Sequence, residues 1–178
     1  MKWKKRHGIF NTKTRWIKPY RVVLHHTAGG TMSGAVQTLI KRGLGYHYII
    51  TKKGDIHEFV PASKWTAHAY KNNRGTIGVS FVGGGRFGPM NAKQLSSTIQ
   101  LLKVLKKDYP SIREVSGHKH VDPRGWKSDP MFPSERVGKV DWKVDAHFMN
   151  LIAGETGLTF VGKSDLRGYS LITWLMRG

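Results

Sequence analysis

The chain alternates between short apolar runs typical of buried strands and longer stretches with the spacing of amphipathic helices. Strands are predicted where β-branched and aromatic residues cluster before turn residues: 21–26, 46–51, 56–60, 76–82 and 113–116. Helices are predicted where apolar residues recur every three to four positions: 33–42, 91–109 and 141–152. Ser33 is expected to cap the first helix, and residues 52–55 to form a hairpin turn. This alternation predicts an α/β protein with a central mixed β-sheet flanked by helices.

The length of 178 residues suits one domain with short extensions. Residues 1–20 contain seven Lys and Arg, no acidic residue and no clear periodicity, so we expect an irregular basic arm. Residues 21–152 hold the alternating elements and form the predicted domain. Residues 153–178 are expected to be a short C-terminal extension, with a weak helical pattern at 171–175.

Thirty Lys and Arg against eleven Asp and Glu give a net charge of +19. This charge favours polyanions as partners: nucleic acid, anionic lipid or anionic wall polymers. The Lys and Arg residues are scattered and no nucleic-acid-binding motif is present, so specific nucleic-acid binding is not expected. The basic start is not followed by the apolar segment of a signal peptide, so we expect a product made in the cytoplasm. Because the chain has no Cys, any metal site must use His and carboxylates.

Three polar segments stand out as candidate chemistry. His25 and His26 end an apolar strand, and the alternation of strand side chains sends their rings to opposite faces. Residues 117–123 (GHKHVDP) follow another strand, and residues 125–130 (GWKSDP) form a loop with a carboxylate. Two imidazoles and a carboxylate are a usual catalytic zinc set, which leaves one position for water. A local site made by His118 and His120 is the rival metal geometry.

Five motifs, in order along residues 20–152, resemble the zinc-dependent N-acetylmuramoyl-L-alanine amidases of the type-2 class. These enzymes are related to the peptidoglycan recognition proteins and to the lysis amidases of bacteriophages. The matching segments are residues 24–29 (LHHTAG), 45–50 (GYHYII), 65–69 (WTAHA), 76–83 (TIGVSFVG), and 117–118 (GH) with 127–130 (KSDP).

The resemblance implies that His25, His118 and Asp129 bind Zn²⁺. Asp129 stands where some relatives use a thiolate, which a chain without Cys cannot supply. Tyr46 would be the active-site tyrosine and Lys127 the active-site lysine of the family.

The remaining histidines divide by their match to the family pattern. His68 falls where the family lines its substrate groove. His26 and His47 have no such role and are interpreted as structural or supporting residues. His120 is expected at the surface or in a loop.

The chain departs from the family pattern at two places. The segment from His118 to Asp129 is one residue longer than the commonest form of this loop, with residues 124–126 filling it. Many members carry Glu where this chain has Ser80, so the acid–base work would fall on Tyr46 and Lys127.

The resemblance implies hydrolysis of the amide between N-acetylmuramic acid and L-alanine in peptidoglycan. We expect a phage lysis enzyme, or endolysin, that is made in the host cytoplasm and acts on the cell wall. The alternatives are a non-catalytic peptidoglycan-binding module and a cytoplasmic wall-recycling amidase. Residues 1–20 are expected to hold the enzyme on anionic wall polymers or lipids. We expect a monomer.

Overall fold

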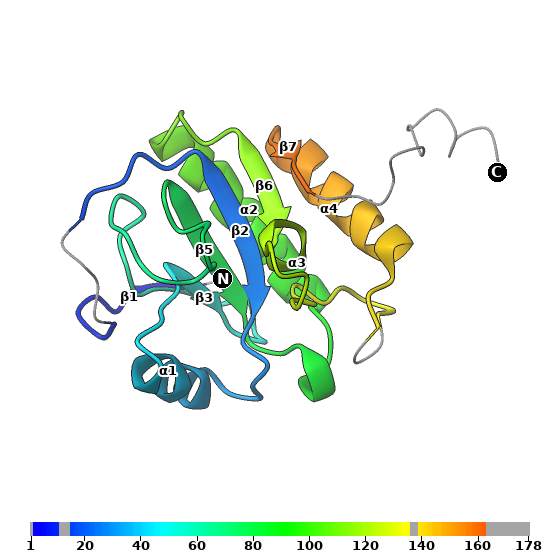
Figure 1. The fold of residues 1–178 in the computed structure, drawn as a ribbon, viewed down its shortest axis with the longest axis horizontal. Helices are drawn as coiled ribbons and strands as arrows, with labels where there is room; N and C mark the ends of the chain where they lie inside the picture. The colour runs from blue at the N-terminus through cyan, green and yellow to red at the C-terminus, as the bar shows by residue number, and fades with distance from the viewer. Residues whose placement is uncertain (1, 11–14, 136–138, 163–178) are drawn as a thin grey trace.

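A seven-stranded sheet runs through the computed structural model, which describes residues 2–10, 15–135 and 139–162 (Figure 1). The strands in chain order are β1 (Trp3–Lys5), β2 (Arg21–His26), β3 (Tyr48–Ile50), β4 (Ile56–Glu58), β5 (Thr76–Phe81), β6 (Glu114–Gly117) and β7 (Thr159–Phe160). Across the sheet they lie in the order β1-β4-β3-β5-β2-β6-β7. Within the described part of the chain, neighbours are parallel except β3 and β4, which form the predicted hairpin. The predicted α/β class with a central mixed sheet is confirmed.

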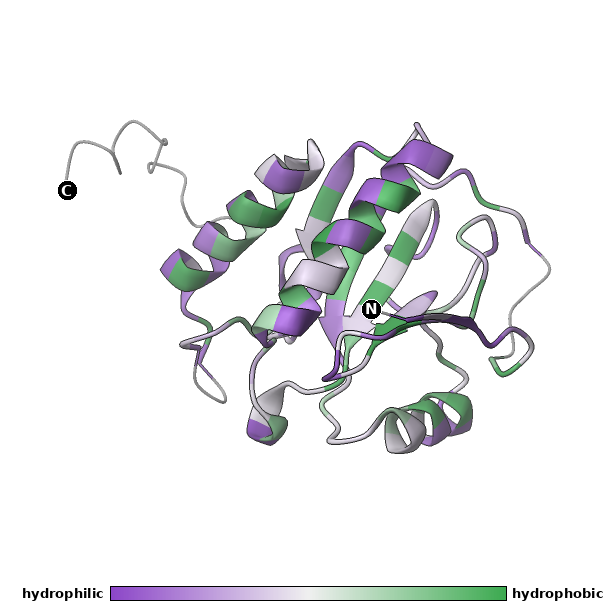
Figure 2. Ribbon diagram, turned by 180° about the vertical axis from the view of Figure 1, so that it is seen from behind, coloured by the Kyte–Doolittle hydropathy of each residue, from purple (hydrophilic) through white to green (hydrophobic). Residues whose placement is uncertain are grey.

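Helices cover both faces of this sheet. They are α1 (Met32–Lys41), α2 (Ala92–Asp108), the single turn α3 (His118–Val121), α4 (Trp142–Thr156) and the short 3₁₀ helix η1 (Gly85–Phe87). Helices α2 and α4 lie across one face (Figure 2), and α1 packs on the other. Among the described residues, no helix has the length and apolar character needed to span a membrane.

The two faces of the central strands differ in chemistry because side chains alternate along each strand. Ile77, Val79 and Phe81 of β5 enter the large core beneath α2 and α4. The residues between them, Gly78 and Ser80, face the other side. Near the carboxyl ends of β2, β5 and β6 this second face therefore carries polar groups, although the strands are buried on both sides.

Capping residues stand directly before the long helices and determine where these helices begin. Asn91 caps α2 in a reciprocal capping box with Gln94, and Asp141 accepts two backbone N–H bonds at the start of α4. The predicted cap of the first helix is wrong, because Thr31 accepts the bond from the Gly34 amide. Ser33 already lies inside the helix, as its second residue, and its hydroxyl donates to that of Thr31.

The N-terminal residues differ from the predicted irregular arm. Trp3–Lys5 form β1, which pairs in parallel with β4 at the edge of the sheet. The Trp3 ring packs edge-on against Tyr48 at 5.8 Å, and its indole N–H donates to Glu58. The basic residues around Trp3 obscured this strand in the sequence.

The chain remains ordered beyond the predicted boundary at residue 152. Helix α4 continues to Thr156 and ends at Gly157, which adopts the left-handed conformation that glycine tolerates. Strand β7 then pairs with β6. The helical pattern expected at 171–175 lies outside the described residues.

Candidate metal centre

The centre is built at the carboxyl ends of the two adjacent parallel strands β2 and β6. His25 is the fifth residue of β2 and is fully buried. Leu24 is in register with Gly117, so His25 in β2 lies beside His118, the first residue of α3. Sites in α/β sheets gather at this edge because the strand ends leave room for loops that carry function.

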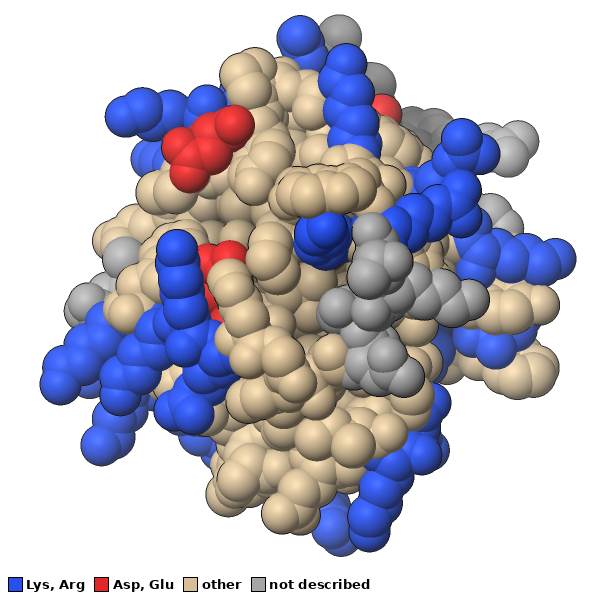
Figure 3. Space-filling view, turned by 90° about the vertical axis from the view of Figure 1, so that its left-hand side faces the viewer, with Lys and Arg blue, Asp and Glu red and all other residues tan. Residues whose placement is uncertain are grey.

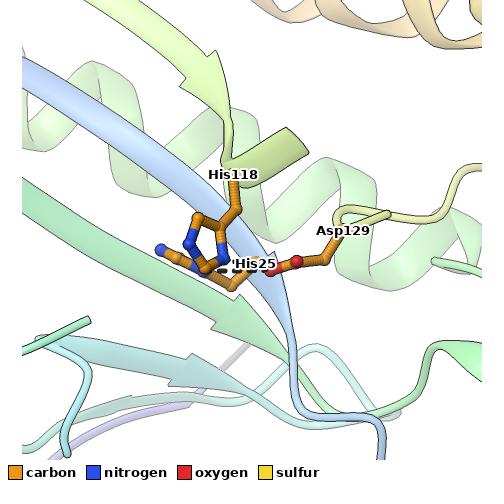
Figure 4. A group of neighbouring side chains, drawn as sticks. All are labelled: His25, His118 and Asp129. Atoms are coloured by element: carbon orange, nitrogen blue, oxygen red, sulfur yellow. Dashed lines mark hydrogen bonds and ion pairs between the residues drawn. The ribbon is translucent and has the colours of Figure 1, made fainter. Parts of the chain in front are cut away.

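Asp129 reaches the same point from the loop that follows α3. Its backbone carbonyl accepts a 2.8 Å hydrogen bond from the Lys119 amide, which holds the loop against α3. The side chains of His25, His118 and Asp129 converge in Figure 4, and all three are buried. The structure therefore brings together the three predicted ligands.

Three side-chain atoms form a nearly equilateral triangle. His25 Nδ1 lies 3.1 Å from His118 Nδ1 and 3.0 Å from Asp129 Oδ2, and the third side, from His118 Nδ1 to Asp129 Oδ2, is 3.1 Å. Ligands about 2.0–2.1 Å from a tetrahedral zinc lie about 3.3 Å apart, close to these separations. Hydrogen bonds alone satisfy at most two sides of the triangle, because the third side joins either two protonated Nδ1 atoms or two acceptors.

The charge state of these groups also suits a cation. Burial, together with the nearby His118, lowers the pKa of His25 to about 4, so its imidazole is neutral near pH 7. Burial alone would raise the pKa of Asp129, but hydrogen bonding to His118, followed by the influence of the adjacent His25, outweighs burial and holds that pKa well below its usual range. A neutral imidazole and an ionised carboxylate are the forms that bind Zn²⁺.

His68 lies behind His25, on the side away from the triangle. His68 Nδ1 is 3.1 Å from His25 Nε2, and His68 Nε2 is 3.1 Å from the Thr76 hydroxyl. That hydroxyl donates to the Asn72 carbonyl, so it accepts from His68 Nε2–H. His68 Nδ1 then accepts from His25 Nε2–H, which leaves the lone pair of His25 Nδ1 free for a metal.

Both ring nitrogens of His68 thus form hydrogen bonds with other residues of the protein, and the ring is buried. Its predicted contact with substrate stays a prediction. The contacts place it as the residue that orients His25.

Tyr46 contacts the centre, and Lys127 lies close to it along the chain. The Tyr46 ring packs against His25 with a centroid separation of 4.8 Å. Burial, followed by the charge of Asp129, raises the pKa of Tyr46, so its hydroxyl keeps its proton near pH 7. Lys127 is half-buried two residues before Asp129 and forms no hydrogen bond or ion pair with any residue that the structure describes. Its ammonium group is therefore free to meet a ligand.

His47 and His26 lie outside the triangle. His47 Nε2–H donates to the Lys64 carbonyl at 2.8 Å, and His47 Nδ1 accepts from the Gly78 amide at 2.9 Å. The His26 ring packs edge-on against Phe81, on the opposite face of β2 from His25. The structural interpretation of His47 is confirmed by these contacts.

The prediction for His120 is wrong. His120 is buried, its Nδ1 accepts from the Gly117 amide at 3.1 Å, and its Nε2 lies 2.6 Å from Asp145 Oδ2. Both nitrogens of His120 are engaged by these groups, and His118 is grouped with His25 and Asp129 instead, so the rival metal site of His118 and His120 is also wrong. The error arose because the partner carboxylate comes from α4, far along the chain.

A buried cluster of charged residues surrounds His120, and no local pattern in the sequence indicates it. Lys119 Nζ lies 2.7 Å from Asp145 Oδ1 and 3.1 Å from Glu135 Oε1, and the side chain of Lys119 is completely inaccessible to solvent. Glu135 also accepts the Phe132 amide. We call Lys119, His120, Glu135 and Asp145 the buried charge cluster. It ties α3, which carries His118, to α4 and to the loop after Asp129.

Two imidazoles beside the carboxyl ends of parallel strands and a carboxylate from the following loop form a donor set that could hold one metal ion. The family model described as N-acetylmuramoyl-L-alanine amidase matches residues 15–132. The chain belongs to this family. The matched residues include all three predicted ligands.

Individual relatives agree with this assignment. Peptidoglycan-recognition protein SD of Drosophila melanogaster is 30% identical over 117 residues, covering 57% of this chain and 63% of that protein. The chain therefore spans less than two thirds of that relative's length.

Two solved structures show the same fold. The N-acetylmuramoyl-L-alanine amidase LysC from Clostridium intestinale URNW superposes with a TM-score of 0.63 at 20% identity, covering 87% of this chain and 98% of that one. The Ph2119 endolysin from Thermus scotoductus MAT2119 bacteriophage Ph2119 gives 0.55 at 21% identity, covering 85% and 98%. Each of these two solved structures is matched over nearly its whole length.

Proposed function

We propose that this protein hydrolyses the amide between the lactyl group of N-acetylmuramic acid and L-alanine in bacterial peptidoglycan, with Zn²⁺ held by His25, His118 and Asp129. The observation that supports the metal is the triangle of donor atoms with sides of 3.0–3.1 Å. When bound, zinc supplies Lewis-acid chemistry that polarises a carbonyl and makes water more acidic. Hydrolysis gives a free lactyl carboxylate and the amino group of the stem peptide.

Tyr46 and Lys127 are assigned the proton transfer and the stabilisation of negative charge. The Tyr46 hydroxyl keeps its proton, so it acts as a hydrogen-bond donor beside His25 and can pass a proton to the leaving nitrogen. Lys127, two residues before Asp129, would supply a cation that stabilises negative charge on the carbonyl oxygen in the transition state. Ser80, in register with His25, has no carboxylate to serve as a base.

The biological role proposed is lysis of the bacterial wall, as in a phage endolysin. Lys and Arg side chains project around much of the face in Figure 3, with few acidic ones among them. This basic surface would hold the protein on anionic wall polymers or lipids, with an affinity that falls as salt rises. Cleavage of intact walls supports the lytic role, whereas activity confined to soluble wall fragments supports a recycling amidase.

A non-catalytic peptidoglycan-binding module is the second candidate, favoured by the match to a peptidoglycan-recognition protein. The complete donor set favours the enzyme, because binding alone does not require a buried His-His-Asp triangle. Tight binding of peptidoglycan without release of free amino termini would support the module.

The deciding experiment measures zinc content and new L-alanine amino termini on purified peptidoglycan. We expect activity to stop after chelation and to return with zinc. His25→Ala, His118→Ala and Asp129→Ala should lose both bound zinc and activity. His26→Ala is the matched control, since His26 is the next residue of β2 and faces the other side. Full activity without zinc would refute the metal mechanism.

A further inference from the structure

Two loops meet beside the metal centre and carry exposed aromatic side chains. One follows His68 and holds Tyr70, and the other lies between His118 and Asp129 and holds Trp126. The Asn72 side-chain amide donates a 2.7 Å hydrogen bond to the Val121 carbonyl, which joins the loops. Tyr70 is 49% exposed and Trp126 is 78% exposed.

A single guanidinium group lies between the two rings. Arg124 Cζ is 4.4 Å from the centre of the Tyr70 ring and 5.0 Å from that of Trp126. We call Tyr70, Arg124 and Trp126 the aromatic–arginine cluster. It presents two apolar ring faces and a cation to solvent, a combination that marks binding surfaces more often than ordinary surface.

The cluster is held in place from below. The buried Asp122 carboxylate accepts from Arg124 Nε at 3.0 Å through Oδ1 and from the Trp126 amide at 3.3 Å through Oδ2. Gly125 makes the intervening turn with a φ of 71°. One carboxylate thus fixes both the cation and the backbone of Trp126, so less conformational entropy is lost on binding.

The chemistry of the substrate identifies the occupant. The scissile amide is joined to the muramic acid ring through a lactyl group only a few atoms long, so the sugar strand must pass close to the metal centre. Trp126 is three residues from Asp129, and Tyr70 is two residues from His68. Pyranose rings have apolar C–H faces that pack on aromatic rings, and their N-acetyl carbonyls accept hydrogen bonds from guanidinium groups.

We propose that the aromatic–arginine cluster is a glycan subsite, which binds a sugar of the peptidoglycan strand next to the muramic acid whose peptide is cleaved. The proposal rests on the proposed amidase function. It assigns a role to residues 124–126, which fill the long loop and have no part in the hydrolysis.

The test compares two substrates and one ligand. The substrates are a muramyl peptide with a single sugar and a polymeric peptidoglycan strand, and the ligand is a peptide-free glycan oligosaccharide. For Trp126→Ala we expect the KM on the polymer to rise about tenfold and oligosaccharide binding to fall about tenfold. On the single-sugar substrate, kcat/KM should stay within about twofold. Trp126→Phe should restore most of the binding, since it keeps an aromatic face.

Trp16→Ala is the control for loss of an exposed tryptophan. Trp16 is 69% exposed and has Lys64 Nζ 3.3 Å above its ring, but it lies on neither loop. This variant should leave the KM on the polymer unchanged.

Several outcomes would overturn the proposal. Equal losses on both substrates would mean that Trp126 acts through the position of Asp129. An unchanged KM on the polymer would refute a glycan subsite. Loss of binding to anionic lipid vesicles, with oligosaccharide binding intact, would assign the cluster to membranes. If the wild type binds the oligosaccharide but cleaves neither substrate, the amidase function fails while the subsite stands.

Discussion

His68 Nδ1 lies 3.1 Å from His25 Nε2, and this contact sets the form in which His25 meets a metal. The Thr76 hydroxyl donates to the Asn72 carbonyl, so it can only accept from His68. Protons are thereby fixed on His68 Nε2 and His25 Nε2. The lone pair of His25 Nδ1 is directed at His118 and Asp129 before any metal binds.

His68→Ala should weaken zinc binding by about tenfold to 100-fold, because His25 loses the partner that fixes its tautomer and ring orientation. Competition with a chelator of known affinity measures this loss. His57→Ala is a control, since His57 is also a buried histidine but packs against Phe59 away from the centre. Unchanged zinc affinity with a raised KM would instead support the predicted contact between His68 and substrate.

Tyr46→Phe removes one hydroxyl and leaves the ring that packs on His25. We expect kcat to fall by about 100-fold at unchanged zinc content, because a proton donor is lost in the transition state. Steady-state kinetics with metal analysis of the same sample checks this. Wild-type turnover in the variant would show that the protonated hydroxyl takes no part.

Lys127→Ala should lower kcat by about 100-fold and leave the zinc content unchanged, since charge stabilisation is lost but no ligand is. Lys127→Arg should recover part of the rate. Lys53→Ala, an exposed lysine in the turn between β3 and β4, is the matched control for net charge. Loss of zinc from Lys127→Ala would recast this lysine as a residue that holds the Asp129 loop.

The convergence of His25, His118 and Asp129 was predicted from the resemblance to the amidase family, because each residue lies in one of the matching motifs. His25 ends an apolar strand, His118 follows a strand and a glycine, and Asp129 lies in a short motif. The role of His68 was not predictable, since it depends on a ring nitrogen meeting another ring across the sheet. The sequence carries residue types and spacing, but it does not carry the tautomer that a tertiary contact selects.

The buried charge cluster shows the same limit more strongly. In the sequence Lys119 and His120 sit in a glycine- and proline-flanked loop and suggest an exposed segment. Their partners Glu135 and Asp145 come from a later loop and from α4, so only the packed structure pairs them. Elements with strong periodicity, such as α2, were predicted almost to the residue, because their signal is local.

Asp145→Asn should lower the free energy of unfolding by about 3 kcal/mol, because it removes one partner of the fully buried Lys119. His118 Nε2 is buried without a hydrogen-bond partner in the described part of the chain, so the orientation of His118 depends on α3. We therefore expect weaker zinc binding as well. Urea unfolding and chelator competition measure the two effects.

Glu155→Gln is the matched control for Asp145→Asn. It breaks the ion pair between Lys103 and Glu155, which also joins α4 to another helix but is about half exposed. Exposed pairs contribute roughly 0–1 kcal/mol. Equal stability of the two variants would contradict a supporting role for the buried charge cluster.

His47 should make stability depend on pH between about 4 and 6.5. Burial lowers the pKa of His47 to about 4, and its Nδ1 accepts from the Gly78 amide, so the folded protein has no place for a second ring proton. Below pH 6.5 the His47 ring binds a proton in the unfolded chain but not in the folded protein. The free energy of unfolding therefore keeps its full value above pH 6.5 and decreases as the pH falls toward 4. The loss is on the order of 3 kcal/mol at the acid end. The check is urea unfolding of the wild type and of His47→Gln, whose amide can keep both hydrogen bonds. The free energy of unfolding should depend less steeply on pH in the variant. Equal pH dependence of the two proteins would refute the assignment to His47.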